Sequence, residues 1–271
     1  MFCGLTGRMS KEHAWPQWLG RGIEVNRSQT SLTFGLNRTG ESLLSETQRR
    51  RVTKNSSVLS TRVREVCAPC NNGWMSRLET AVRPLLEKLW APSYPLGRTT
   101  ISVDEAAVLA TWAAKMAWVR EKANGPDLTS TPQMRGDLAA TGRPPDLTTV
   151  WFARFDGLNN FGSYVAQSEV THLQKDWDTE DSRRVQVCSL SFCGLAIVVK
   201  TDSGPGLRPM YLQGETWQPV WPVGSAVQWP PSRAVSDDEV YNVASQVSRW
   251  ATIPAVELEP NHDGWRIEHR N

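Results

Sequence analysis

The sequence predicts an α+β fold in which residues 1–90 form one part and residues 91–271 form a second. Two observations support this prediction. Strand-like patterns follow one another from residue 148 onward, whereas the longer helical patterns lie mainly before that point. Pro92 and Pro95 fall between the two parts and mark a boundary. We therefore expect a small N-terminal module, then helices and a mostly antiparallel sheet with a terminal helix.

The composition limits the class of protein. A chain of 271 residues can bury a hydrophobic core, and a net charge of +2 is too small for a polycation that coats nucleic acid. There is no apolar run of about 18 residues and no signal-peptide pattern at the start, so we expect a cytoplasmic protein without a membrane span. Five cysteines at uneven spacing favour metal binding or buried thiols over a disulfide framework.

The N-terminal part contains only short elements before its helix. Residues 3–19 are expected to form a turn, a short strand and a second turn, because the start is rich in glycine and Pro16 excludes a helix. Apolar residues at helical spacing predict a helix over 75–90, which Pro84 is expected to kink or split in two. Further short strands are expected at 31–34 and 58–66.

The second part begins with a strong helical pattern. A nearly apolar helix is expected over 105–122 with Asp104 as its N-cap, and the Gly- and Pro-rich stretch 126–147 is expected to be a loop. A final helix over 237–250 is expected to begin after Ser236, a favoured N-cap residue. Strands are expected at 150–155, 161–166, 185–192 and 195–200, the last two joined by a turn at Cys193-Gly194. This part contains no motif that assigns it a role, so it is an accessory domain of unknown role.

The spacing of the cysteines predicts a metal site. Cys67 and Cys70 stand in a tight turn with the spacing of a zinc knuckle, in which two thiolates bind one tetrahedral ion. Cys3 is a candidate third thiolate, so we expect a structural Zn²⁺ at these three cysteines. A structural zinc site normally has four ligands; in a three-cysteine site, water, His13 or the chain terminus would complete it. The other two cysteines lie in apolar strands and are expected to be core residues.

Two blocks of sequence carry a recognisable pattern. The first contains Phe2-Cys3-Gly4 and SKEHAWPQWL at 10–19, and the second is VCAPCNNGWMSRLE at 66–79. Together they resemble the zinc-knuckle branch of the HNH (His-Me finger, ββα-metal) endonucleases. The resemblance covers about a third of the chain. It implies that residues 1–90 form a ββα-metal module that hydrolyses nucleic-acid phosphodiester bonds. It also makes Cys3 the second cysteine of a first knuckle, so we expect a longer gene product with the fourth zinc ligand one residue before Met1.

The resemblance also implies roles for individual residues. Hydrolysis of a phosphodiester needs a base that takes a proton from water and a cation that neutralises the developing negative charge. By resemblance, His13 is the general base. Glu12 and Asn71 hold a catalytic divalent cation, Mg²⁺ or Mn²⁺, with Asn72 as the alternative to Asn71.

One residue of the HNH pattern is displaced. The middle asparagine, which steadies the histidine in these enzymes, is absent from its usual place; Arg62 stands about there, and Asn55 is the nearest candidate. Arg62 also belongs to a basic group that we interpret either as a phosphate-contacting surface or as a solvated face. This group consists of Arg49, Arg50, Arg51, Lys54, Arg62 and Arg64.

Three functions are consistent with these features. The leading hypothesis is a metal-dependent endonuclease whose partner is DNA, although the sequence does not distinguish DNA from RNA. The second is a catalytically inactive, zinc-stapled nucleic-acid-binding protein, favoured by the displaced asparagine and the incomplete knuckle. The third places the activity in residues 148–250 and makes the zinc module purely structural.

Overall fold

The computed structural model of the chain describes residues 1–4, 8–20, 31–35, 51–52, 61–90, 98–124, 129–157, 161–172, 181–204, 210, 212 and 214–250. Within these ranges the protein combines helices with mainly antiparallel sheets, which confirms the α+β prediction at the level of fold class. None of the helices in these ranges is both long enough and apolar enough to cross a bilayer.

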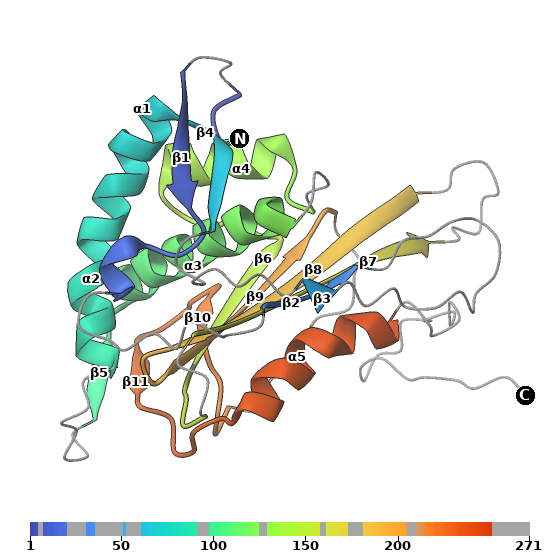
Figure 1. The fold of residues 1–271 in the computed structure, drawn as a ribbon. Helices are drawn as coiled ribbons and strands as arrows, with labels where there is room; N and C mark the ends of the chain where they lie inside the picture. The colour runs from blue at the N-terminus through green and yellow to red at the C-terminus, as the bar shows by residue number, and fades with distance from the viewer. Residues whose placement is uncertain are drawn as a thin grey trace, which may run out of the picture.

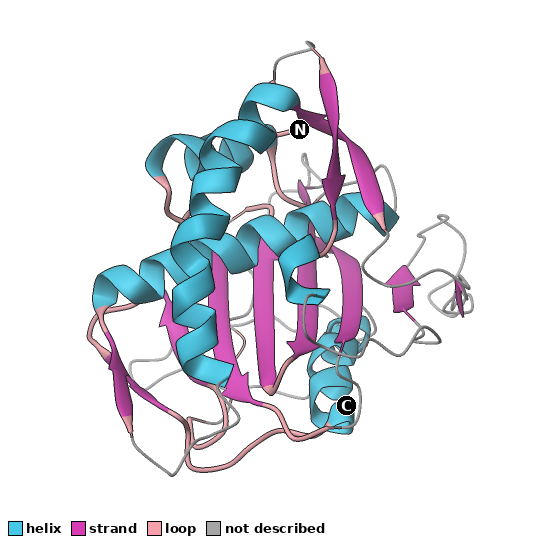
Figure 2. Cartoon of the chain, turned by 60° about the vertical axis from the view of Figure 1, so that its left-hand side comes forward, coloured by secondary structure: helices cyan, strands magenta, loops and turns pink. Residues whose placement is uncertain are grey.

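A seven-stranded sheet forms the centre of the molecule (Figure 2). Its pairings are antiparallel except that β2 runs parallel to β7. The predicted strands of the second part are confirmed, with longer bounds at several ends, and the predicted turn at Cys193-Gly194 joins β8 to β9. In spatial order the strands are β10 (Gln218–Trp221), β6 (Thr148–Arg154), β9 (Leu195–Asp202), β8 (Asp181–Phe192), β7 (Phe161–His172), β2 (Ser31–Gly35) and β3 (Arg51–Val52).

Helices cover both faces of this sheet. The helix α3 (Val103–Asn124) crosses one face, and α5 (Asp237–Trp250) lies against the other (Figure 1). Alternate residues of the strands therefore face two separate apolar clusters, as expected for strands buried on both sides. The predicted helix 237–250 is confirmed, and Ser236 caps it by accepting a hydrogen bond from the Glu239 backbone N–H.

The N-terminal part packs on the outer side of α3. Here β1 (Met9–His13) pairs antiparallel with β4 (Arg62–Cys67), and the chain continues through the short α1 (Ala68–Cys70) into α2 (Ser76–Trp90). The predicted helix 75–90 is confirmed, but the prediction that Pro84 would split it is wrong, since α2 runs through Pro84 without a break. The break lies earlier, at Gly73, where φ is −96° and ψ is −109°.

Two predictions about the second part are wrong. The cap of α3 is Ser102 rather than Asp104: the Ser102 hydroxyl accepts from the Glu105 N–H, and the Glu105 carboxylate accepts from the Ser102 N–H. The stretch 126–147 is not only a loop, because it contains the helix α4 (Pro132–Thr141). Thr131 caps this helix and Gly142 ends it at φ +65°, both ordinary helix-boundary signals. A two-stranded sheet of β5 (Thr99–Ile101) and β11 (Val227–Trp229) was also not predicted.

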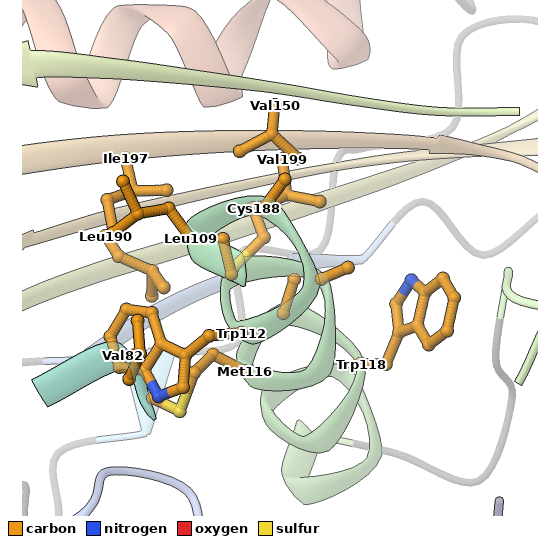
Figure 3. Close-up of a cluster of buried hydrophobic side chains, with 14 of the residues drawn as sticks. Val82, Leu109, Trp112, Met116, Trp118, Val150, Cys188, Leu190, Ile197 and Val199 are labelled. Carbon is orange, nitrogen blue, oxygen red and sulfur yellow. The ribbon is translucent and has the colours of Figure 1, made fainter. Parts of the chain in front are cut away.

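The two parts share one hydrophobic core. Trp15, which follows β1, packs edge-on against Phe192 of β8 with ring centroids 5.6 Å apart, and Trp112 of α3 packs against the same ring at 5.8 Å. Figure 3 shows Trp112 of α3 lying beside Val82 of α2, while Leu109, also on α3, points toward the sheet. The boundary predicted near residue 90 therefore does not separate two independent cores. This shared burial explains why α3 is apolar all round.

Candidate functional site

Three cysteines meet at one end of the β1–β4 pair. The Sγ atoms of Cys3, Cys67 and Cys70 all lie within 4.8 Å of one another, and those of Cys3 and Cys67 are 3.2 Å apart. Cys67 ends β4 and caps the helical turn that starts at Ala68 and contains Pro69. This turn brings Cys70 back, so that the Cys70 backbone N–H donates to Cys67 Sγ at 3.4 Å. The sequence prediction that these residues lie together is confirmed.

The cluster is chemically suited to a zinc ion. Tetrahedral zinc with sulfur ligands at about 2.3 Å places the sulfurs roughly 3.8 Å apart, so small side-chain shifts would accommodate the ion. Burial, together with hydrogen bonds to the neighbouring sulfurs, raises the pKa of Cys70 to about 12, so without a cation it is a neutral thiol. Cys3 is exposed, which leaves one side of the cluster open to solvent.

His13 is not part of this cluster. The register of the strand pair places Met9 opposite Cys67 and His13 opposite Arg62, four residues further along β1. At about 3.3 Å per residue, this separation is too long for a shared ion. The alternative in which His13 supplies the fourth zinc ligand is therefore wrong.

The imidazole of His13 is held by two donors. Its Nε2 accepts a hydrogen bond from Arg62 Nε at 2.9 Å and lies 3.0 Å from the side-chain amide nitrogen of Gln17. Because a guanidinium can only donate, Nε2 carries the lone pair and the neutral ring has its proton on Nδ1. Arg62, which stands near the expected place of the steadying asparagine, thus fixes the ring itself.

The electrostatic surroundings keep His13 neutral. Burial and then the charge of Arg62 lower the pKa of His13 below its ordinary value of 6.5, against the opposing effect of Glu12 and Glu79. At neutral pH the imidazole is therefore mainly in the form that accepts a proton, as a general base requires.

Glu12 forms a buried ion pair with a residue far away in sequence. Lys115, near the middle of α3, is fully buried, and its Nζ lies 2.6 Å from Glu12 Oε1 and 2.9 Å from Glu79 Oε1. Burial alone would lower the pKa of Lys115, but the charges and hydrogen bonds of the two carboxylates outweigh it and raise the pKa above 10.5. Lys115 is therefore a permanent positive charge at this place.

A single pocket brings the predicted catalytic residues together. Glu12, His13 and Asn71 all contribute to its lining, whereas Asn72, the alternative to Asn71, is exposed and is not among the lining residues. The full lining is Lys11, Glu12, His13, Pro16, Gln17, Trp18, Asn71 and Glu79. The arrangement offers one neutral imidazole, two amides, one ammonium and two carboxylates around one space.

Only some of the predicted ligands in this pocket are available to a catalytic divalent cation. Carboxylate and amide oxygens are suitable ligands for Mg²⁺ or Mn²⁺. However, Oε1 of Glu12 already contacts the ammonium of Lys115, and a metal ion at that oxygen would have to displace a fully buried lysine. The predicted pair of ligands is therefore close in space, but Glu12 is already paired with a positive charge.

The predicted basic surface is only partly described. Arg62 and Arg64 lie on β4 with exposed side chains, and Arg62 adjoins the pocket through His13. Arg51 starts β3 at the edge of the large sheet rather than on the β1–β4 pair. The predictions for Arg49, Arg50, Lys54 and the alternative asparagine Asn55 lie outside the described residues.

Sequence reasoning missed Lys115 and Glu79. Glu79 ends the second resembling block, so its place in the motif was a usable signal. Lys115 stands in an otherwise apolar stretch of α3, and a lysine on an apolar helix needs a buried partner. Comparisons with family models, curated proteins and solved structures give no match for this chain.

Proposed function

We propose that this protein is a nuclease of the HNH type that hydrolyses phosphodiester bonds, with DNA as its substrate and His13 as the general base. The observation that carries the proposal is the pocket in which Glu12, His13 and Asn71 meet. The frame of that pocket, an antiparallel strand pair followed by a helix, has a three-cysteine cluster at its far end. The resembling sequence blocks supply these same residues.

The proposed reaction uses the lone pair on His13 Nε2. This atom takes a proton from water, the resulting hydroxide attacks phosphorus, and the bond to the leaving oxygen breaks. The leaving oxygen then takes a proton from solvent and departs as an alcohol, and His13 returns its proton to solvent. In the free protein Arg62 and Gln17 surround Nε2. A substrate phosphate competes for Arg62, because guanidinium and phosphate form strong paired hydrogen bonds, and this exchange releases Nε2 for the water.

Zinc has a structural role in this proposal. Bound by Cys3, Cys67 and Cys70, it would fix the end of β4 against the start of the helical segment and so hold the pocket in shape. The resemblance assigns the catalytic positive charge to Mg²⁺ or Mn²⁺ on Glu12 and Asn71, a place where the protein already has the ammonium of Lys115.

Cleavage of supercoiled plasmid by the purified full chain tests the proposal. We expect His13→Ala to slow nicking by about 10²- to 10⁴-fold, the usual contribution of a general base. His172→Ala, in β7, is the matched histidine control and should nick like the wild type. Equal nicking by wild type and His13→Ala would rule out His13 as the base.

A second candidate is a zinc-stapled protein that binds nucleic acid without cutting it. The observation in its favour is that both polar groups of the Glu12-His13 pair already have protein partners, Lys115 and Arg62. Binding of labelled duplex DNA that weakens with salt, without any cleavage over long incubation, would favour this candidate over the nuclease.

A further inference from the structure

We propose that Lys115 takes the place of the divalent cation at the Glu12 carboxylate, so that the pocket needs no Mg²⁺ or Mn²⁺. This inference rests on the proposed nuclease function for its chemical meaning, but it concerns an ion-binding property that is measured separately. Lys115 is a positioning residue here, because its ammonium is fully buried and the residue is not among those that line the pocket.

The position of the ammonium supports this inference. Lys115 Nζ lies between two carboxylates that come from different elements, Glu12 of β1 at 2.6 Å and Glu79 of α2 at 2.9 Å. Two carboxylates with a positive charge between them form the kind of arrangement in which a metal ion is otherwise bound. The lysine reaches this place from α3, which belongs to the other part of the chain.

The burial of the lysine argues against its displacement. The side chain of Lys115 is 0% exposed, and α3 is enclosed by α2 on one side and the sheet on the other. An exposed lysine could swing into solvent when a metal ion arrives, whereas this one would have to carry its charge through an apolar core. Binding of a metal ion at Glu12 Oε1 is therefore opposed by the cost of moving Lys115.

Other residues remain to contact the phosphate. Lys11 and Arg62 are exposed beside the pocket and carry positive charge toward solvent. Glu12 and Glu79 are paired to Lys115. The side chains of Lys11 and Arg62 therefore supply the positive charge that neutralises the phosphate, and Asn71 contributes a neutral polar group. The pocket then holds a base, an anion-binding pair and an internal cation.

Titration of the zinc-loaded full chain with Mn²⁺ tests the inference. Binding is measured as the decrease in the electron paramagnetic resonance signal of free Mn²⁺. We expect the wild type to have no Mn²⁺ site in which Asn71 is a ligand. Wild type and Asn71→Ala should therefore give the same titration curve. Lys115→Ala should gain about one Mn²⁺ per chain, because it leaves two carboxylates facing an emptied space, and Lys115→Ala/Glu12→Gln should lose it again.

Two results would overturn the inference. One is Mn²⁺ binding by wild type that Asn71→Ala abolishes; the other is a folded Lys115→Ala that gains no site. If Lys115→Ala does not fold, Lys115→Met keeps the length of the side chain, and the comparison of wild type with Asn71→Ala still decides.

Nicking in metal-depleted buffer, with and without added Mg²⁺, separates this inference from the proposed function. Equal nicking under both conditions supports Lys115 as the internal cation, and strict Mg²⁺ dependence contradicts it. A wild-type protein that nicks under neither condition contradicts the nuclease proposal, while the Mn²⁺ titrations still test the role of Lys115.

Discussion

At the scale of single residues, the site depends on how charged groups pair. His13 is kept neutral by burial and by Arg62, whereas Lys115 is kept charged by Glu12 and Glu79. His13 on β1 and Lys115 on α3, which share Glu12 and Glu79 as charged neighbours, thus end with opposite tendencies, one toward the neutral and one toward the charged form. Pairs of titratable groups that are pushed apart in this way are typical of catalytic sites.

Arg62→Gln is expected to shift the pH dependence of cleavage. Arg62 lowers the pKa of His13, so removing its charge raises that pKa and moves the acidic limb of kcat/KM to higher pH. Burial, the larger cause, stays, so the shift is partial. A pH profile checks this, with Arg62→Lys as the control that keeps the charge. An acidic limb that stays in place in Arg62→Gln would contradict the assignment of His13 as the titrating base.

Glu12→Gln is expected to destabilise the fold by about 3 kcal/mol, because it leaves a fully buried ammonium with one partner fewer. Glu79→Gln should cost less, since that side chain is 25% exposed and water can replace part of the pairing. The pKa of Lys115 is raised, so its contribution is fully present at neutral pH and is lost only as pH rises through the raised value. Urea unfolding at pH 7 measures the free energy of unfolding of both variants. An equal loss of that free energy in Glu12→Gln and Glu79→Gln would contradict this ranking.

At the scale of elements, the strand pair β1–β4 separates two chemical tasks. Its Cys67 end joins the sulfur cluster, and its His13 end joins the pocket. The helix α2 follows from the cysteine end and returns Glu79 toward the pocket. A metal ion at one end can therefore affect the geometry at the other through one short strand pair, whose register shifts between Ser10 and Glu12.

Cys67→Ser is expected to abolish zinc binding and to disturb the fold of the N-terminal part, because the site loses one of its three thiolate ligands. Cys193→Ser is the matched control, since Cys193 lies at the β8–β9 turn outside the cluster. Zinc content of the purified proteins and their near-ultraviolet circular dichroism check this. About one zinc in wild type and Cys193→Ser is the expected outcome, and unchanged zinc in Cys67→Ser would contradict it.

Zinc affinity should also fall as pH decreases. The raised pKa of Cys70 means that its thiol must lose a proton before it binds the ion, so binding releases protons and is favoured at higher pH. Competition with a chromogenic chelator between pH 6 and 8 measures the slope. An affinity that does not change with pH would contradict binding through this thiol.

At the scale of the whole molecule, α3 connects the pocket to the sheet. It packs against α2 and the sheet (Figure 1). Its Lys115 contacts Glu12 and Glu79, two residues that line the pocket. The hydrophobic core thus continues across the boundary at residue 90 that the prolines suggest. Residues 1–90 contribute one wall of a joint core, which includes Trp15 and Val82.

A fragment of residues 1–90 is therefore expected to remain unfolded even with zinc, because the apolar faces that α3 covers would be exposed. Circular dichroism and amide proton dispersion of the zinc-loaded fragment check this, beside the full chain. A well-dispersed, cooperatively unfolding fragment would contradict the joint core.

Local signals predicted much of the fold. The capped helix α5 and the strands β8 and β9 carry strong patterns and have nearly the predicted bounds. The helix α4 was missed although Thr131 and Gly142 mark its ends, because the Gly- and Pro-rich composition of the segment outweighed them. The parallel placement of β2 beside β7 depends on contacts between distant segments, which no local pattern records.

Local signals likewise predicted some residues of the candidate site and missed others. Cys67 and Cys70 are close in sequence, and the resembling blocks brought Cys3, His13 and Asn71 into consideration. The pairing of Lys115 with Glu12 spans 103 residues, and it depends on how α3 packs across the strand pair. Such a contact follows from tertiary packing and could not be predicted from spacing.

The measurement that tests the central claim most directly is chemical rescue of His13→Ala in the plasmid-nicking assay. If the imidazole of His13 is the general base, the variant nicks far more slowly than wild type, and added imidazole restores part of the rate in proportion to its unprotonated form. A variant that nicks as fast as wild type without imidazole would contradict the claim that His13 performs this chemistry.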